Sequence, residues 1–272
     1  VTCVDVDPEK IQMLQNGSIP FYEKDLPQLV HDGIYSDRLH FTTSLEDGIK
    51  DTPYVFVAVA TPQSSAGEPN LSQLYEVASG LAEFSTGSKI IIIKSTVPIG
   101  SFNCFDSLLR QDHIDEKRFK LVCCPEFLAE GSAVQDFFHP TRTIFGASEE
   151  EIAKDVGALF KGVSGPRIYT NIETAQLIKY ASNSFLASRI AFINEISRIC
   201  ELFSVDVHHV ERGMLLDPRF GNGYLNAGIG YGGACLSKDL SALIYTARSS
   251  GLEPILCNAI AAQNEQQIWH TI

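Results

Sequence analysis

Apolar runs alternate with amphipathic segments along the first half of the chain. Near-continuous apolar runs cover residues 54–60, 90–93 and 121–123, as is typical of strands buried on both faces of a parallel sheet. The segments 71–84 and 101–109 between them place apolar residues at helical spacing. Strands that alternate with helices predict an α/β fold with a doubly wound sheet.

Weaker patterns flank these segments. Residues 1–6 indicate a short strand, and residues 8–15 indicate a helix with Pro8 in its first turn. A further strand is predicted at 143–146 and a further helix at 149–160.

The second half of the chain is predicted to be helical. Residues 172–203 keep helical periodicity without a proline or glycine, which is long for a globular helix, so we expect it to cross a domain or form an interface. Further helices are predicted at 240–248 and 254–272. The chain therefore divides into an α/β domain over 1–169 and a helical domain over 170–272.

Composition narrows the class of protein. The 272 residues are 44% hydrophobic and 20% charged, which indicates a globular protein. A net charge of −12 argues against a nucleic-acid surface, because phosphate binding needs a basic face. No apolar run reaches the length of about 18 residues that a membrane span needs. The seven irregularly spaced cysteines include no C-x-x-C pair, so we expect no metal site, no disulfide framework and a cytoplasmic protein.

The stretch 230–239 carries the strongest candidate chemistry. It joins glycines to Cys235, a lysine and an aspartate, directly before a helical pattern. A thiol after a glycine bend, near a helix N-terminus and an ammonium, lies where a thiolate is stabilised. The alternative is a buried structural cysteine in a tight turn, and the stretch alone leaves both open.

Polar residues follow three of the predicted strands, where parallel sheets bind their ligands. Thr61 and Thr96 each come after an apolar run, and either could instead be a helix N-cap. Glu126 and Glu130 follow the run at 121–123. Because they are four residues apart, they would share one face of a helical turn and could move protons or simply face solvent.

Two further patterns have a functional and a structural interpretation. Asp5 ends the first predicted strand, where dinucleotide-binding folds place a carboxylate on the ribose, but Asp5 or Asp7 could instead cap the following helix. Lys179 and Asn183 lie four residues apart on the long predicted helix. They could donate hydrogen bonds to a developing oxyanion or form a structural polar pair.

Motifs occur in order along the whole chain, at 4–7, 19–23, 59–62, 94–100, 125–133, 178–183, 192–195, 217–221 and 230–239. In these motifs the chain resembles the UDP-glucose/GDP-mannose dehydrogenase family. The resemblance implies an enzyme that uses NAD to oxidise the C6 alcohol of a nucleotide sugar to a carboxylate. Tyr231 in the Gly-Tyr-Gly-Gly sequence favours conversion of UDP-glucose to UDP-glucuronate. GDP-mannose or another nucleotide sugar is the alternative substrate.

The same resemblance implies catalytic roles. Cys235 would be the nucleophile that carries a thiohemiacetal and then a thioester. Lys179 and Asn183 would stabilise oxyanions. Asp239 would order a water and help to remove the alcohol proton. Glu130 would assist hydrolysis of the thioester.

The resemblance also implies binding roles and a partner. Thr96 would position the hydrolytic water. NAD would lie around Asp5, Lys10, Thr61, Thr96, Glu130 and Lys238. The nucleotide sugar would contact Glu126, Phe127, Leu128, Ala129, Glu130, Lys179, Asn183, Arg219, Tyr224, Leu225, Asn226, Ala227, Gly228 and Gly232. A homodimer would form through the long helix, with Arg219 reaching the substrate of the partner subunit.

Two features typical of this family are absent from the sequence: the first strand with its glycine-rich loop, and the C-terminal UDP-binding domain. We therefore expect a truncated Rossmann-like sheet followed by an all-helical central domain, in a fragment with little activity alone. A non-catalytic dimerising or ligand-binding module is the alternative, although the five retained reacting groups disfavour it. A 6-phosphogluconate or 3-hydroxyacid dehydrogenase would share the plan but would need no cysteine nucleophile.

Overall fold

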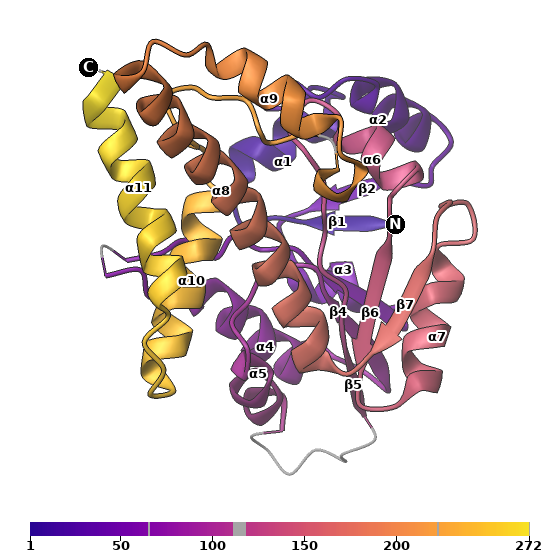
Figure 1. Ribbon diagram of the computed structural model, residues 1–272. Helices are drawn as coiled ribbons and strands as arrows, with labels where there is room; N and C mark the ends of the chain where they lie inside the picture. The colour runs from indigo at the N-terminus through magenta and orange to yellow at the C-terminus, as the bar shows by residue number, and fades with distance from the viewer. Residues whose placement is uncertain (65, 111–117, 222, 272) are drawn as a thin grey trace. The chain divides into compact units, whose positions relative to one another are not determined.

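The computed structural model describes residues 1–64, 66–110, 118–221 and 223–271 (Figure 1). The chain forms two compact units. The first, here called the sheet unit, comprises Val1–Thr61 and Leu71–Gln176. The second, here called the helical unit, comprises Pro62–Asn70 and Leu177–Ile272. Each unit has a hydrophobic core of its own.

The described strands of the sheet unit form a two-stranded sheet, β1-β2, and a five-stranded sheet in the order β3-β4-β5-β6-β7. Their bounds are Thr2–Val4 (β1), His40–Thr42 (β2), Tyr54–Val57 (β3), Lys89–Ile93 (β4), Phe119–Cys123 (β5), Thr143–Ala147 (β6) and Arg167–Thr170 (β7). The pairs β1–β2, β3–β4, β4–β5 and β6–β7 are parallel. The predicted α/β sheet is therefore present, and its parallel core is β3-β4-β5.

One pairing differs from the parallel sheet that the sequence predicts. Strand β6 runs antiparallel to β5, with Val122 opposite Ala147 and Cys123 opposite Gly146. An antiparallel neighbour needs no crossover across a sheet face, and mixed edges are common on doubly wound sheets. A buried apolar run does not encode strand direction, so the pattern at 143–146 could not reveal this.

The helices of the sheet unit are α1 (Pro8–Gln15), α2 (Leu26–Tyr35), α3 (Leu45–Ile49), α4 (Ser72–Phe84), α5 (Ser101–Leu109), α6 (Ala133–Phe138) and α7 (Glu150–Leu159). Helix α8 (Ile172–Leu202) begins in this unit and continues into the helical unit, which also contains α9 (Val207–Leu215), a short 3-10 turn (Pro218–Phe220), α10 (Leu236–Ser249) and α11 (Ile255–Thr271). The long helix predicted from 172 is confirmed. Ile272, the last residue of the predicted final helix, lies outside the described residues.

Helix α10 begins at Leu236, four residues before the predicted start at Leu240. Its first turn contains Ser237, Lys238 and Asp239, and these polar residues hide the apolar periodicity that marked the rest of the helix. The short elements β2, β7, α3 and α6, together with α2 and α9, were not predicted. The strands β2 and β7 and the helices α3 and α6 carry too few periodic positions to stand out from loop sequence.

The sheet core depends on close contact between β6 and the start of α8. Ile91, Ile92 and Ile93 of β4 are fully buried, as expected for a central strand of a covered sheet. At Gly146 of β6, an added Cβ would lie 2.6 Å from the carbonyl oxygen of Asn171 and 2.6 Å from the Cβ of Ala175. Glycine is therefore required there for the helix to approach the strand.

The core of the helical unit joins three helices to the glycine-rich stretch. Ala187 and Ala191 of α8 and Leu240 of α10 pack with Ile260 of α11 and with Tyr231. Burial raises the pKa of Tyr231 to about 12, so this ring remains neutral at physiological pH. Helix α10 packs beside α11 (Figure 1). None of the described helices is long and apolar enough to cross a bilayer.

A buried lysine ties β4 to the end of α3 and yields a test of the fold. The ammonium of Lys89, which is 3% exposed, donates hydrogen bonds to the carbonyl oxygens of Ile49 at 2.6 Å and Thr52 at 2.8 Å. Replacing Lys89→Met leaves both carbonyls without this donor, so we expect the free energy of unfolding to fall by about 1–3 kcal/mol. Urea denaturation measures the change. The control Lys120→Met removes an exposed lysine of β5. Equal urea midpoints for the two variants would contradict a stabilising role for the hydrogen bonds of Lys89.

Candidate active site

The glycine-rich stretch places Cys235 at the N-terminus of α10. Cys235 occupies the N-cap position, and the N–H group of Asp239 donates to its carbonyl oxygen at 2.9 Å. Gly230 and Gly233 adopt left-handed backbone conformations, with φ of 102° and 74°, which favour glycine. Cys235 is exposed, so the alternative of a buried structural cysteine is wrong. The positive end of the helix dipole favours negative charge at this position.

A buried polar cluster lies on the turn that follows Cys235. The carboxylate of Asp239 is 1% exposed. It accepts a hydrogen bond from the Asn183 Nδ2 at 2.6 Å and another from the Lys238 Nζ at 2.7 Å. A buried carboxylate is tolerated only when it is paired in this way. The cluster therefore joins α8 to α10 and brings together three residues that the sequence nominated.

Lys179 lies one helical turn before Asn183 on α8, and both side chains are buried. Residues four apart on a helix share a face. Cys235 and Asp239 are likewise four residues, or one helical turn, apart at the start of α10. The two helices thus present an ammonium, an amide, a carboxylate and a thiol, which are the group types that nucleophilic catalysis with oxyanion stabilisation requires.

The predicted substrate loop of the helical unit has a mixed character. Leu225 is buried, whereas Tyr224, Asn226, Gly228 and Gly232 are exposed and Ala227 is half-buried. Tyr224 has a left-handed φ of 59°. The exposed guanidinium of Arg219 is bound to Asp217 of its own chain, with the Nη2 at 2.5 Å from the Oδ2. Its role toward a partner subunit stays a prediction.

Asp5 follows β1, and its environment separates the two interpretations left open by the sequence. Asp7 caps α1, because its Oδ1 accepts from the N–H groups of Glu9 and Lys10 at 2.9 and 3.2 Å. Asp5 instead forms an ion pair with the Lys10 Nζ at 2.7 Å. Burial acts to raise the pKa of Asp5, but the hydrogen bonds from Lys10 and the Asp7 N–H outweigh it and hold this pKa below its usual value. A partly exposed carboxylate at a strand end fits hydrogen bonding to ribose hydroxyls.

The two threonines tie neighbouring strand ends together. The Thr61 Oγ1 donates to the carbonyl oxygen of Thr96 at 2.8 Å, and the Ser95 Oγ donates to the carbonyl oxygen of Val59 at 2.7 Å. Neither threonine caps a helix, since the residues at the N-caps of α4 and α5 are Leu71 and Gly100. The N-cap alternative is therefore wrong for both.

The two glutamates do not share a helical face. Residues 124–129 are irregular and Glu130 lies in a turn, because the helix that follows, α6, begins only at Ala133. The Glu126 Oε2 turns back to accept the N–H of Leu128 at 2.6 Å. Glu130 is exposed. The expected face-sharing pair is thus corrected to two carboxylates on one loop.

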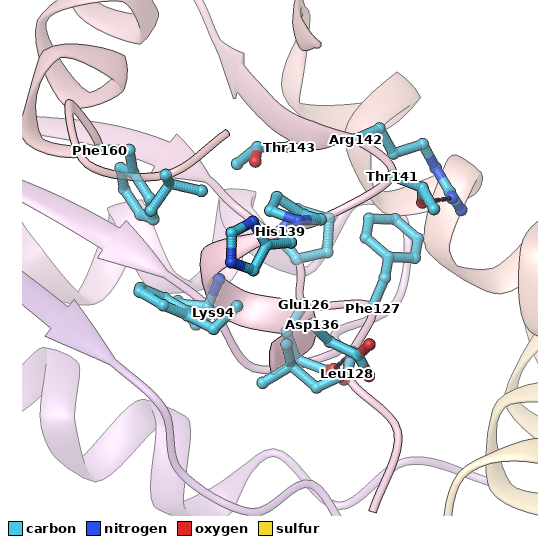
Figure 2. A pocket seen from close by; sticks show the side chains of 14 residues that line it. Lys94, Glu126, Phe127, Leu128, Asp136, His139, Thr141, Arg142, Thr143 and Phe160 are labelled. Atoms are coloured by element: carbon cyan, nitrogen blue, oxygen red, sulfur yellow. Dashed lines mark hydrogen bonds between the residues drawn. The ribbon is translucent and has the colours of Figure 1, made fainter. Parts of the chain in front are cut away.

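A pocket of about 90 Å³ opens beside this loop, and Lys94, Phe127 and His139 are among its lining residues (Figure 2). Arg142 lies over the ring of Phe127, with its guanidinium carbon 4.0 Å from the ring centroid, a cation–π arrangement. The Lys94 Nζ lies 3.8 Å from the Sγ of buried Cys124. Among the described residues, no group of histidine, cysteine and carboxylate side chains could hold a metal ion.

Comparisons with known proteins agree with this geometry. A family model described as the NAD binding domain of the UDP-glucose/GDP-mannose dehydrogenase family matches residues 1–164. The model of the central domain of the same family matches residues 173–266. The chain belongs to the UDP-glucose/GDP-mannose dehydrogenase family.

Individual relatives with similar sequences are named as UDP-glucose 6-dehydrogenases. The UDP-glucose 6-dehydrogenase TuaD of Bacillus subtilis is 39% identical over 272 residues, which are all of this chain and 59% of the relative. A UDP-glucose 6-dehydrogenase of Pseudomonas aeruginosa is 37% identical over 98% of this chain and 60% of its own length. The chain therefore spans about three fifths of the length of these relatives.

Solved structures show the same fold. A UDP-glucose dehydrogenase from Pyrobaculum islandicum superimposes with a TM-score of 0.94 at 34% identity, over 98% of this chain and 62% of that structure. GDP-mannose dehydrogenase from Pseudomonas aeruginosa gives a TM-score of 0.77 at 26% identity, over 98% and 63%. A 3-hydroxyisobutyrate dehydrogenase from Mycobacterium tuberculosis, at 12% identity and a TM-score of 0.65, shares the fold alone.

Two buried residues of this family member hold the strand-end loops, although the sequence pattern had given neither a role. The Glu23 carboxylate accepts the N–H groups of Gly131 and Ala133, each at 3.0 Å. The Gln176 Nε2 donates to the carbonyl oxygen of Pro98 at 2.6 Å. Both contacts link residues that are distant in sequence, so no local pattern could predict them. The one sequence signal was the position of Glu23 within the family motif at 19–23.

Glu23 yields a test of how the Glu126–Glu130 loop is held. In the native protein each carboxylate oxygen of Glu23 accepts one backbone N–H. The change Glu23→Gln replaces one of these oxygens by an NH₂ group, which cannot accept and faces an N–H donor. We expect a loss of about 1–2 kcal/mol of local stability, so hydrogen exchange at Gly131 and Ala133 should accelerate about 5–30-fold. The matched control, Glu76→Gln, alters an exposed glutamate of α4. Unchanged exchange in Glu23→Gln would contradict the role.

Proposed function

We propose that this chain carries the reacting centre of an NAD-dependent enzyme that oxidises UDP-glucose to UDP-glucuronate. The supporting observation is the exposed Cys235 at the N-terminus of α10, one turn before the buried Asn183–Asp239 contact. The relatives named UDP-glucose 6-dehydrogenase, at 37–39% identity, support this nucleotide sugar. Glucuronate formation requires removal of four electrons from one carbon.

Cys235 is the proposed nucleophile. Loss of a proton and a first hydride converts the C6 alcohol to an aldehyde. The Cys235 thiolate adds to the aldehyde carbon to form a thiohemiacetal, which loses its hydroxyl proton and a second hydride to leave a thioester on the Sγ. Water then attacks the thioester carbon, which releases the carboxylate and returns the thiol. The N-terminus of α10 stabilises the thiolate of Cys235 whenever it is not bonded to substrate.

The buried polar groups serve the charges that form during these steps. Lys179 and Asn183 donate to the oxygen that becomes negative when the thiolate or water adds to the carbonyl carbon. Because both are buried, their dipole and charge act in a medium of low dielectric. Asp239 accepts the alcohol proton through an ordered water, and its contacts with Asn183 and Lys238 hold it in one orientation.

The sheet unit supplies the proposed cofactor site. NAD held by this unit would supply the hydride acceptor for both oxidations. Asp5 binds the ribose hydroxyls, and the linked loops of Thr61 and Thr96 present backbone and hydroxyl groups at the strand ends. We assign the remaining NAD contacts to Lys10, Glu130 and Lys238, and hydrolytic roles to Glu130 and Thr96.

The substrate site and domain limits follow the sequence predictions. We assign the nucleotide sugar to the residues Glu126, Phe127, Leu128, Ala129, Glu130, Lys179, Asn183, Arg219, Tyr224, Leu225, Asn226, Ala227, Gly228 and Gly232. We assign residues 1–169 to NAD binding and 170–272 to the central domain, in a cytoplasmic protein.

A homodimer through α8 is the proposed assembly. Phe185, Phe192 and Ile199 follow one another at intervals of seven residues and are 62%, 47% and 45% exposed. A seven-residue repeat of apolar side chains forms a stripe that a second helix can cover. The stripe supports a second copy of this chain as its partner, because helices of two copies can pair along identical faces.

Substitution of Cys235 tests the mechanism. In the protein expressed from its complete coding sequence, two NADH should form for each UDP-glucose consumed. Cys235→Ser should reduce formation of the acid by about 10³-fold or more, because a serine hydroxyl is a poor nucleophile without an adjacent base. Lys179→Ala should reduce kcat by about 10²–10³-fold. Both are measured by NADH absorbance and product chromatography.

Cys104→Ser is the matched control, since Cys104 is also exposed but has no proposed role. It should keep the wild-type rate. Full four-electron oxidation by Cys235→Ser would exclude the covalent mechanism, and failure of the wild-type protein to oxidise any nucleotide sugar would exclude the function.

The dimer has a separate test. Wild-type protein should have twice the chain mass in sedimentation equilibrium, and Phe192→Glu should shift it to the monomer, because a charge in an apolar seam stays unpaired. The control Tyr35→Glu adds a charge at an aromatic residue of α2 that is 87% exposed and should leave the mass unchanged. A monomeric wild type, or a dimeric Phe192→Glu, would contradict pairing through α8.

A further inference from the structure

Buried polar side chains hold the backbone that leads to Cys235. The N–H of Ala227 donates to the Glu211 Oε1 of α9 at 2.6 Å. Gly228 donates its N–H to the Asn194 Oδ1 of α8 at 2.8 Å, and its carbonyl oxygen accepts from the Gln267 Nε2 of α11 at 2.8 Å. These side chains are at most 6% exposed. Three helices therefore fix a segment without regular structure of its own.

Of these buried anchors, Asn264 of α11 binds the residue nearest to Cys235 in sequence, Tyr231. Its Oδ1 accepts the N–H of Tyr231 at 2.8 Å, and its Nδ2 donates to the carbonyl oxygen of Tyr231 at 3.0 Å. Both atoms of one amide thus pair with both backbone groups of one residue, as a neighbouring strand would. Asn264 is 8% exposed, so loss of either bond leaves a buried group unsatisfied.

Gly230 allows this contact to form. A Cβ on Gly230 would lie 2.6 Å from the Asn264 Oδ1, well inside van der Waals contact. The φ of Gly230 is 102°, a region that side chains disfavour. The glycine therefore serves the approach of Asn264 as well as the bend.

We propose that Asn264 is a positioning residue for the candidate nucleophile. The chain between the clamped Tyr231 and Cys235 consists of residues 232–234. On the other side of Cys235, α10 is anchored by Leu240 in the core that also contains Tyr231. The backbone of Cys235 is thus anchored on both sides, and the amide of Asn264 supplies the anchor on the loop side. The proposal rests on the nucleophilic role of Cys235.

The variant Asn264→Asp tests this with little change in shape. Its carboxylate still accepts the N–H of Tyr231 but cannot donate to the carbonyl oxygen, which it repels. With the loop anchor weakened, the thiol spends less time at the N-terminus of α10, where the positive end of the helix dipole favours a thiolate. We expect the rate of Cys235 alkylation by iodoacetamide at pH 7 to fall about 3–10-fold, with the pH–rate midpoint shifted upward.

The measurement is peptide-resolved mass spectrometry after timed alkylation across a pH series. Exposed Cys3 and Cys104 serve as internal standards, and buried Cys200 reports general loosening. Gln266→Glu is the matched control, because it also converts an amide to a carboxylate on α11 but at an exposed position. It should leave the Cys235 profile unchanged. Gly230→Ala should reproduce the effect of Asn264→Asp from the opposite side of the contact.

The outcomes are distinct. A slower Cys235 with a raised midpoint, and unchanged Cys3, Cys104 and Cys200, supports positioning by Asn264. An unchanged Cys235 profile in a folded Asn264→Asp protein overturns the proposal. Faster alkylation of buried Cys200 also overturns it, because general loosening of the helical unit would then explain the change at Cys235. Alkylation needs no substrate or cofactor, so failure of the proposed oxidation would leave this result readable. In the active protein, Asn264→Asp should lower kcat more than it raises KM.

Discussion

Burial of the Asp239 carboxylate is the constraint on which the candidate active site depends. A carboxylate that is 1% exposed is stable only while Asn183 and Lys238 remain bonded to it. The bond from Asn183 requires α8 and α10 to keep their spacing and rotation. Because Cys235 is the N-cap of α10 and Lys179 lies on the same face of α8 as Asn183, the contact that satisfies one buried charge also sets the placement of Cys235 and Lys179.

Loops elsewhere in the chain are held by the same physical device. Side chains rather than backbone ladders satisfy the strand-end segments: Thr61 binds the carbonyl of Thr96, and Glu23 binds two N–H groups after Glu130. Asn264 does the same for Tyr231. Irregular backbone can reach a ligand in ways that a regular strand cannot, but its polar groups then need buried partners. These loops are therefore anchored by side chains that lie far from them in the sequence.

Family membership and the geometry of the candidate active site are two independent observations. The matched models cover residues 1–164 and 173–266, which establishes descent. The geometry adds that Cys235 is exposed and that Asp239 is buried and paired, which is compatible with the proposed covalent catalysis.

The sequence by itself determined the α/β pattern, the long α8, the helix at Pro8–Gln15 and the motif that contains Cys235, because periodicity and glycine placement are local properties. It also indicated Lys179, Asn183 and Asp239 through their spacing and family resemblance. Only the tertiary structure decided the antiparallel β6, the irregular loop at Glu126 and Glu130, and the choice of Asp7 rather than Asp5 as a helix cap. Only the tertiary structure also revealed Glu23 and Asn264 as anchors. Strand direction and side-chain partners depend on contacts between residues far apart in the chain, and no local pattern encodes them.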